Sequence, residues 1–200
     1  MKETNLRFTN NLRLRNNTRR IVLHHTATDY DVSAATVHNW HINQGWSGIG
    51  YHYLIRLDGS IERGRTENTI GAHAGSEGNG DSIGIALVGN FEKTAPNANQ
   101  IDALIKLIMD IESRYGVLSI VEHKDIVNTA CPGRRFPLEE VIKRVEEARK
   151  KMVEPWKRDL MNQAKTLGLI TSDHDPDEPA TKWFVLAVAI NLLKIVGRIK

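Results

Sequence analysis

The sequence predicts an α/β fold in which helices flank a mixed β-sheet, followed by a small helical appendage at the C-terminal end. Three observations lead to this prediction. Short apolar runs of strand type alternate with segments of helical periodicity, the pair Asp58-Gly59 separates two short strand-like runs, and the composition changes after Pro155. Strands that alternate with helices are typical of sheets with parallel pairs, and the hairpin adds an antiparallel pair.

The individual elements follow from local signals. Ser33 is placed to cap the first helix, Gly45 and Gly116 to end two helices, and Pro137 to begin another. The predicted strands are residues 19–28, 51–57, 60–65, 82–89 and 118–123, and the first of them ends near His24-His25. The predicted helices of the main domain are residues 31–45, 99–116 and 137–152.

Composition limits the class of protein. Charged residues make up 26% of the chain and hydrophobic residues 40%, as in an ordinary soluble folded protein. The single cysteine, Cys131, excludes an intramolecular disulfide, so it acts as a thiol, a thiolate or a metal ligand. The basic N-terminus is not followed by an apolar run, so we expect synthesis in the cytoplasm without a signal peptide.

Three regions are expected along the chain. Six of the first twenty residues are Lys or Arg against one acidic residue, which predicts a solvated basic arm over residues 1–17. Nucleic acid is the less favoured reading of this charge and is not predicted as a partner. Residues 18–152 form the main domain and residues 153–200 a helical C-terminal domain.

The C-terminal region is predicted to be a helix, an acidic proline-containing loop over residues 171–181 and a second, mostly apolar helix over 182–196. That last helix is too short for a bilayer span, so no transmembrane segment is predicted. The region loosely resembles segments of the S-layer-homology type, which implies cell-wall binding. The alternative is a helical pair that packs on the main domain or forms a dimer through the apolar face of residues 183–196.

Chemistry is expected where histidines follow strands. Both His24 and His123 stand at predicted strand ends, where α/β sheets commonly carry their active groups. Short zinc motifs such as H-E-x-x-H and C-x-x-C are absent from the sequence. Any metal site must therefore be assembled from distant segments.

Five motifs occur in a fixed order between residues 20 and 137: "VLHHTAT", "GWSGIGYHYLI", "GAHA", "SIGIALVGN" and "EHKDIVNTACPG". Together they resemble the type 2 N-acetylmuramoyl-L-alanine amidase family, which includes phage lysozyme-type amidases and animal peptidoglycan-recognition proteins. The resemblance implies that His24, His123 and Cys131 bind one zinc ion. Recognition-only relatives typically lack this cysteine, so its presence favours an enzyme.

The resemblance also assigns residues around the metal. It implies that Tyr51 donates a hydrogen bond to the developing oxyanion or to the water network. Thr129, two residues before Cys131, resembles the recognition-protein branch. It would position or stabilise neighbouring groups rather than act as a strong cation. His73 could hydrogen-bond the substrate or intermediate. His25 is expected to be a packing residue rather than a ligand.

The function that the resemblance implies is zinc-dependent hydrolysis of the amide bond between N-acetylmuramic acid and L-alanine in peptidoglycan. The muramyl group and stem peptide would then be the partner, and a phage or prophage endolysin the best context, with an exported bacterial autolysin as an alternative. A non-catalytic peptidoglycan-binding or regulatory protein is a second reading. A cysteine peptidase with Cys131 as nucleophile and His123 as base is a third, which leaves His24 and Tyr51 without roles.

Overall fold

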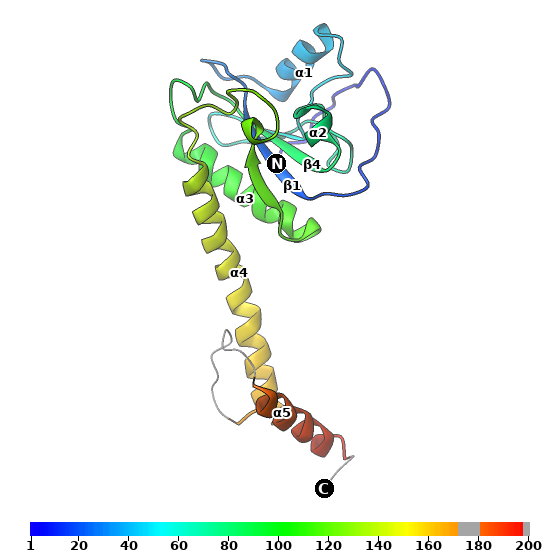
Figure 1. The fold of residues 1–200 in the computed structure, drawn as a ribbon, viewed down its shortest axis with the longest axis vertical. Coiled ribbons are helices and arrows are strands. Elements are labelled where there is room, and N and C mark those ends of the chain that lie inside the picture. The colour runs from blue at the N-terminus through cyan, green and yellow to red at the C-terminus, as the bar shows by residue number, and fades with distance from the viewer. Residues whose placement is uncertain (172–180, 198–200) are drawn as a thin grey trace. The chain divides into compact units, whose positions relative to one another are not determined.

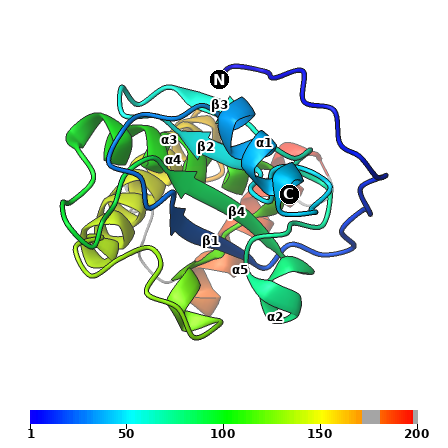
Figure 2. The same cartoon turned by 90° about the horizontal axis from the view of Figure 1, so that it is seen from above.

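The computed structural model describes residues 1–171 and 181–197 of the 200-residue chain. The chain divides into two compact units, Met1–Val145 and Glu146–Lys200. The first unit contains a five-stranded sheet with the strand order β3-β2-β4-β1-β5 (Figures 1 and 2). Its strands are β1 (Arg20–His25), β2 (Tyr53–Ile55), β3 (Ile61–Arg63), β4 (Ser82–Leu87) and β5 (Ser119–Glu122).

The sheet is mixed, as predicted. Strand β1 pairs in parallel with β4 and β5, and β2 pairs in parallel with β4 and antiparallel with β3. The β2–β3 hairpin turns at Asp58-Gly59, where Asp58 Oδ1 accepts the backbone N–H of Ser60 at 2.8 Å and Gly59 has φ of 83°. A positive φ favours glycine, which explains why this dipeptide predicts the turn.

The helices largely follow their predicted caps. Ser33 accepts the backbone N–H of Thr36 at the start of the first helix, and Asn97 and Gln100 form a capping box at the start of the third, which ends at Gly116. The helices are α1 (Ala34–Asn43), α2 (Gly75–Asn79), α3 (Ala98–Tyr115), a 3₁₀ turn η1 (His123–Asp125), α4 (Leu138–Thr166) and α5 (Lys182–Ile195).

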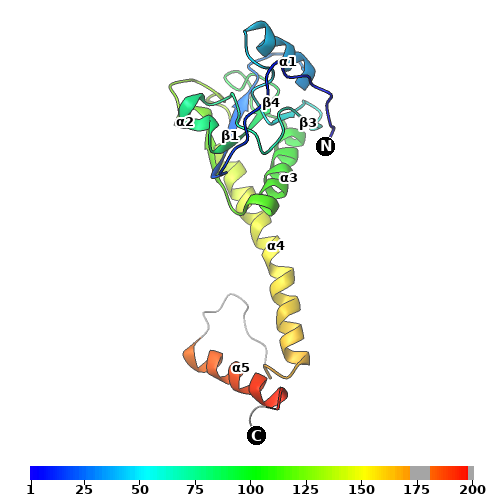
Figure 3. The same cartoon turned by 90° about the vertical axis from the view of Figure 1, so that its right-hand side faces the viewer.

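Helices cover both faces of the sheet. Figures 1 and 3 show α1 on one side of the strands and α3 on the other. On the α1 side, a buried cluster joins Val37 of α1 to Leu54 of β2 and Ala86 of β4. Because Ala86 is the registered partner of His24, and paired residues point to the same face, the His24 side chain points to the α1 side.

The prediction of a separate arm over residues 1–17 is wrong, although most of these residues are exposed as expected. The backbone of Lys2 pairs with β3 through Lys2 N–H to Ile61 O at 2.8 Å and Arg63 N–H to Lys2 O at 3.0 Å. The guanidinium of Arg15 donates to three backbone carbonyls of the main domain. A count of charges does not reveal that these polar groups have fixed backbone partners, so the segment belongs to the first unit.

Two further expectations need correction. The glycine-rich stretch after His73, for which no helix was predicted, contains the short helix α2, in which Gly78 is buried and leaves no room for a side chain. The predicted end of the helix at residue 152 is also wrong, since α4 continues from Leu138 through Pro155 to Thr166. A proline removes one hydrogen-bond donor, and good helix formers on both sides continue the helix.

In the second unit, α5 contacts the turn that follows α4. Asn191 Nδ2 donates to Leu169 O at 3.1 Å, and Ile170 is buried. Most of the predicted acidic loop, residues 172–180, lies outside the described residues. Within the described part of the chain, no helix combines the length and apolar character that crossing a bilayer requires.

Candidate metal centre and active site

The first predicted ligand, His24, stands near the end of the central strand β1. Its side chain is fully buried, and its ring lies 4.5 Å from the ring of His123 between centroids. His123 is the first residue of η1, directly after β5. Strands β1 and β5 pair in parallel, so their C-terminal ends lie side by side. This pairing brings His24 and His123 together, although they are 99 positions apart in sequence.

The loop that follows η1 brings Cys131 back to it. The backbone N–H of Lys124 donates to Cys131 O at 2.9 Å, which closes the loop between them. Gly133 has φ of 110°, and a Cβ at this position would lie 2.4 Å from the carbonyl carbon of Phe91. Only glycine fits this close approach without a backbone shift, so the "CPG" sequence holds the thiol in place.

The three side chains have the geometry of a metal site. One ligand atom from each of His24, His123 and Cys131 lies within 4.8 Å of the other two, and Cys131 Sγ is 3.7 Å from His24 Nδ1. Zinc bonds of about 2.3 Å to sulfur and about 2.0 Å to nitrogen, at a tetrahedral angle, put these two atoms about 3.5 Å apart. Two imidazoles and a thiol therefore fit one zinc ion and leave a fourth position open.

The surroundings keep the imidazoles available as ligands. Burial lowers the pKa of His24 well below its ordinary value of 6.5, and the neighbouring imidazoles of His123 and His25 lower it further. Burial also lowers the pKa of His123. Both rings are therefore neutral at neutral pH, and each offers a lone pair to a metal.

The thiol of Cys131 is not an activated nucleophile. Burial raises its pKa to about 11, against a smaller lowering effect of the His25 backbone N–H. A catalytic cysteine needs a lowered pKa, so this environment argues against a cysteine peptidase. A metal ion, in contrast, displaces the thiol proton as it binds.

The other histidines of the sheet region are held by the backbone. In each of four rings, Nδ1 accepts a main-chain N–H at 2.9–3.2 Å, which leaves that nitrogen without a free lone pair for a metal. These pairs are His25 with Phe91, His38 with Ile49, His41 with Gly50 and His52 with Gly84. This agrees with the expectation that His25 is a packing residue.

The remaining predicted residues surround the cluster. The Tyr51 ring lies 5.1 Å from the His24 ring, and burial, with a smaller effect of Cys131, raises the pKa of its phenol. Thr129 Oγ1 accepts the backbone N–H of Cys131 at 3.3 Å. His73 Nδ1 lies 2.9 Å from His24 Nε2, so this ring contacts a candidate ligand directly.

Sequence reasoning missed the residues that support His73. Ser82 Oγ lies 3.4 Å from His73 Nε2, and the ring lies against Gly71 and Gly84. Serine and glycine at these positions carry no distinctive signal in the motifs "GAHA" and "SIGIALVGN", so only the structure relates them to the site.

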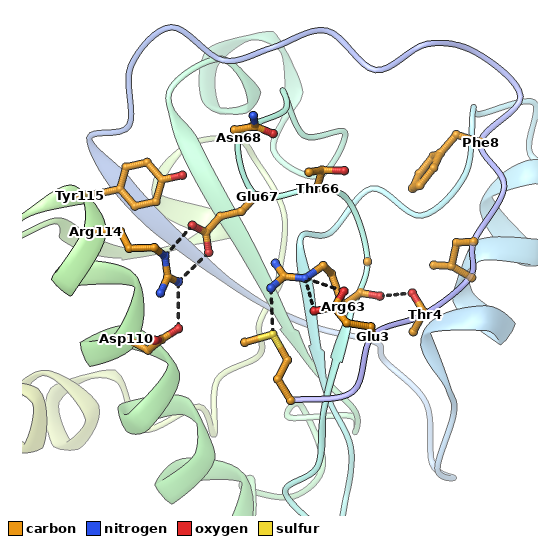
Figure 4. Close-up of a pocket in the computed structure, with 13 residues that line it drawn as sticks. Glu3, Thr4, Phe8, Arg63, Thr66, Glu67, Asn68, Asp110, Arg114 and Tyr115 are labelled. Carbon is orange, nitrogen blue, oxygen red and sulfur yellow. Dashed lines mark hydrogen bonds and ion pairs between the residues drawn. The ribbon is translucent and has the colours of Figure 1, made fainter.

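A separate cavity of about 810 Å³ lies between the N-terminal segment and the C-terminal end of α3 (Figure 4). Its charged groups are paired with one another: Arg63 with Glu3 at 3.0 Å, and Arg114 with Glu67 at 2.8 Å and Asp110 at 2.9 Å. None of the three candidate ligands lines it, so its size does not make it the reaction site.

A mixed α/β sheet that brings two neutral imidazoles and a thiol together offers the three protein ligands that catalytic zinc sites use. The donor set does not by itself specify which bond is cut.

Comparison with known proteins specifies the family. A family model described as N-acetylmuramoyl-L-alanine amidase matches residues 14–134. The endolysin of Klebsiella phage KP32 is 36% identical over 125 residues, which cover 59% of this chain and 82% of the phage protein. The solved structure of N-acetylmuramoyl-L-alanine amidase LysC from Clostridium intestinale URNW is 38% identical, with a TM-score of 0.69 over 72% of this chain and 95% of that one.

A third similar structure is peptidoglycan recognition protein-LE in complex with tracheal cytotoxin, a monomeric diaminopimelic acid-type peptidoglycan. It is 26% identical, with a TM-score of 0.61 over 67% of this chain and 85% of that one. The chain belongs to the N-acetylmuramoyl-L-alanine amidase family, and it is an enzyme that hydrolyses an amide bond of peptidoglycan.

Proposed function

We propose that this protein is a zinc-dependent endolysin-type amidase that cuts the bond between N-acetylmuramic acid and L-alanine, with one zinc ion held by His24, His123 and Cys131. The observation that carries the zinc proposal is the 3.7 Å separation of Cys131 Sγ and His24 Nδ1, within a cluster whose ligand atoms are all within 4.8 Å of one another. That separation suits zinc bonded to both atoms.

The donor set suits hydrolysis. Two neutral histidines and one thiolate leave a net charge of +1 on a Zn²⁺ site. When bound, zinc supplies Lewis-acid chemistry, polarising the amide carbonyl and lowering the pKa of a water molecule towards neutrality. Thr129 accepts the Cys131 N–H and so helps to orient the thiolate.

Tyr51 is the proposed hydrogen-bond donor to the oxygen that gains negative charge. Its raised pKa keeps the phenol protonated at neutral pH, and its ring lies beside His24. A protonated group already in place stabilises the developing oxyanion without reorganisation.

Replacing Tyr51 with phenylalanine is expected to lower kcat by about 10²-fold, because the oxyanion loses one donor. Zinc content, measured by atomic absorption, should not change. Tyr30→Phe is the matched control, since Tyr30 is 63% exposed, and it should keep full activity. An unchanged kcat in Tyr51→Phe would remove Tyr51 from the mechanism.

The substrate proposal draws on the relatives. One is a phage endolysin, one is an amidase, and one was solved with a peptidoglycan fragment bound. We therefore propose that the muramyl group and stem peptide are recognised here too, and that the protein is made in the cytoplasm and acts on the bacterial cell wall.

The division at residues 152/153 and the wall-binding role of residues 153–200 remain proposals. A dimer through the apolar residues of α5 also remains a prediction.

The proposed activity is tested with purified peptidoglycan sacculi. We expect loss of turbidity and release of free L-alanine amino termini, detected by mass analysis. A chelator should remove more than about 90% of the activity and added zinc should restore it, because the reaction depends on the ion. Activity that persists in metal-free protein would refute the zinc proposal, and zinc binding without release of termini would favour the non-catalytic alternative.

A further inference from the structure

The imidazole of His73 is held in a narrow space between neighbouring residues. A Cβ at Gly84 would lie 2.5 Å from His73 Cδ2, and a Cβ at Gly71 would lie 2.3 Å from the same atom. The side-chain oxygen of Asn79 accepts the backbone N–H groups of His73 and Ala74 at 2.7 and 2.8 Å. Two glycines and an asparagine therefore position a ring that is itself 7% exposed.

Hydrogen bonds connect the Gly78 carbonyl, Ser82, His73 and His24 in a network. The positions of its protons can be assigned by starting at Gly78. The Ser82 hydroxyl donates its single proton to the Gly78 carbonyl at 2.5 Å. Towards His73 Nε2, 3.4 Å away, Ser82 Oγ can therefore only accept. His73 then carries its proton on Nε2, and in the neutral ring Nδ1 is an acceptor.

The assignment continues to the candidate ligand. His73 Nδ1 accepts across 2.9 Å, so His24 Nε2 must carry the proton of its neutral ring. His24 Nδ1 is left with a free lone pair, and this is the atom that faces Cys131 Sγ. His25, the adjacent residue, instead has its Nδ1 occupied by the backbone N–H of Phe91.

We propose that His73 is a positioning residue for metal binding: the chain from the Gly78 carbonyl through Ser82 and His73 fixes His24 as the Nε2–H tautomer and aims its Nδ1 at the metal. This inference rests on the proposed zinc function. It gives His73 a role through His24, in place of the predicted contact with substrate. Partners of this kind, bonded to the second nitrogen of a ligating histidine, typically change metal affinity by about 10- to 100-fold.

The test compares His73→Leu, which removes the acceptor, with His73→Asn, whose side-chain oxygen can take the place of Nδ1. Zinc dissociation constants are measured by competition with a chromophoric chelator, and thermal unfolding without zinc is followed in parallel. We expect about 10- to 100-fold weaker binding in His73→Leu and partial recovery in His73→Asn. His38→Leu is the matched control, because His38 is equally buried but lies outside the network, and its zinc affinity should equal that of the wild type.

The outcomes separate this inference from the proposed function. A wild type that binds no zinc overturns both. A His73→Leu variant that binds zinc as tightly as the wild type overturns the positioning role alone. Should His73→Leu fail to fold, ¹⁵N NMR of the histidine rings in zinc-free wild type decides: a proton on His24 Nε2 supports the inference and a proton on Nδ1 contradicts it.

Discussion

Cys131→Ser is expected to lose zinc and to lower amidase activity by a factor on the order of 10³ or more. A serine hydroxyl is a poor ligand at neutral pH, so His24 and His123 would be left to hold the ion alone. Without the ion, nothing lowers the pKa of the attacking water towards neutrality. Activity is measured as released L-alanine amino termini, zinc content by atomic absorption, and wall binding by pelleting with sacculi, which we expect to be retained.

The variant Cys131→Asp tests whether Cys131 acts as a metal ligand or as a nucleophile. A carboxylate oxygen can bind zinc, so this variant should recover part of the zinc affinity and part of the activity. A nucleophilic cysteine would be lost in both variants, and thiol alkylation would then inactivate the enzyme regardless of added zinc. Full activity in Cys131→Ser would contradict the proposed metal site.

Arg15→Ala is expected to lower the free energy of unfolding by about 2–4 kcal/mol, because buried carbonyls lose a charged donor. The Arg15 guanidinium donates to Glu67 O at 2.6 Å, Thr69 O at 2.8 Å and Ser82 O at 3.0 Å. Without it, three main-chain acceptors lose a charge-assisted hydrogen bond. Urea unfolding followed by tryptophan fluorescence measures the change.

The matched control is Arg13→Ala. Arg13 carries the same charge two residues away, but its side chain is exposed, so the substitution should change stability by less than about 0.5 kcal/mol. Equal effects of the two variants would show that the charge of the segment matters and its hydrogen bonds do not.

Local signals predicted most of the fold. The hairpin depended on Asp58-Gly59 and the C-terminal end of α3 on Gly116, and these are properties of a few adjacent residues. The elements that were missed depend on distant partners. The N-terminal segment is held by carbonyls of residues 67–82, and the glycines of α2 are tolerated because Gly78 packs closely against Ala74 and Ile126.

The candidate site was accessible from sequence only through resemblance. His24 and Cys131 are 107 residues apart, and their proximity depends on the pairing of β1 with β5 and on the turn at Gly133. No periodicity or spacing encodes such a contact. The link from His73 to His24 is still less accessible, because it also depends on the register that places Gly84 beneath the ring.

The backbone pairing of Lys2 with β3 has a consequence for solubility. Strand β3 lies at the edge of the sheet, and an uncovered edge offers free N–H and C=O groups to the strands of other molecules. The hydrogen bonds from Lys2 occupy part of that edge. Residues that precede the family match at position 14 thus cover part of the exposed sheet edge in the folded enzyme.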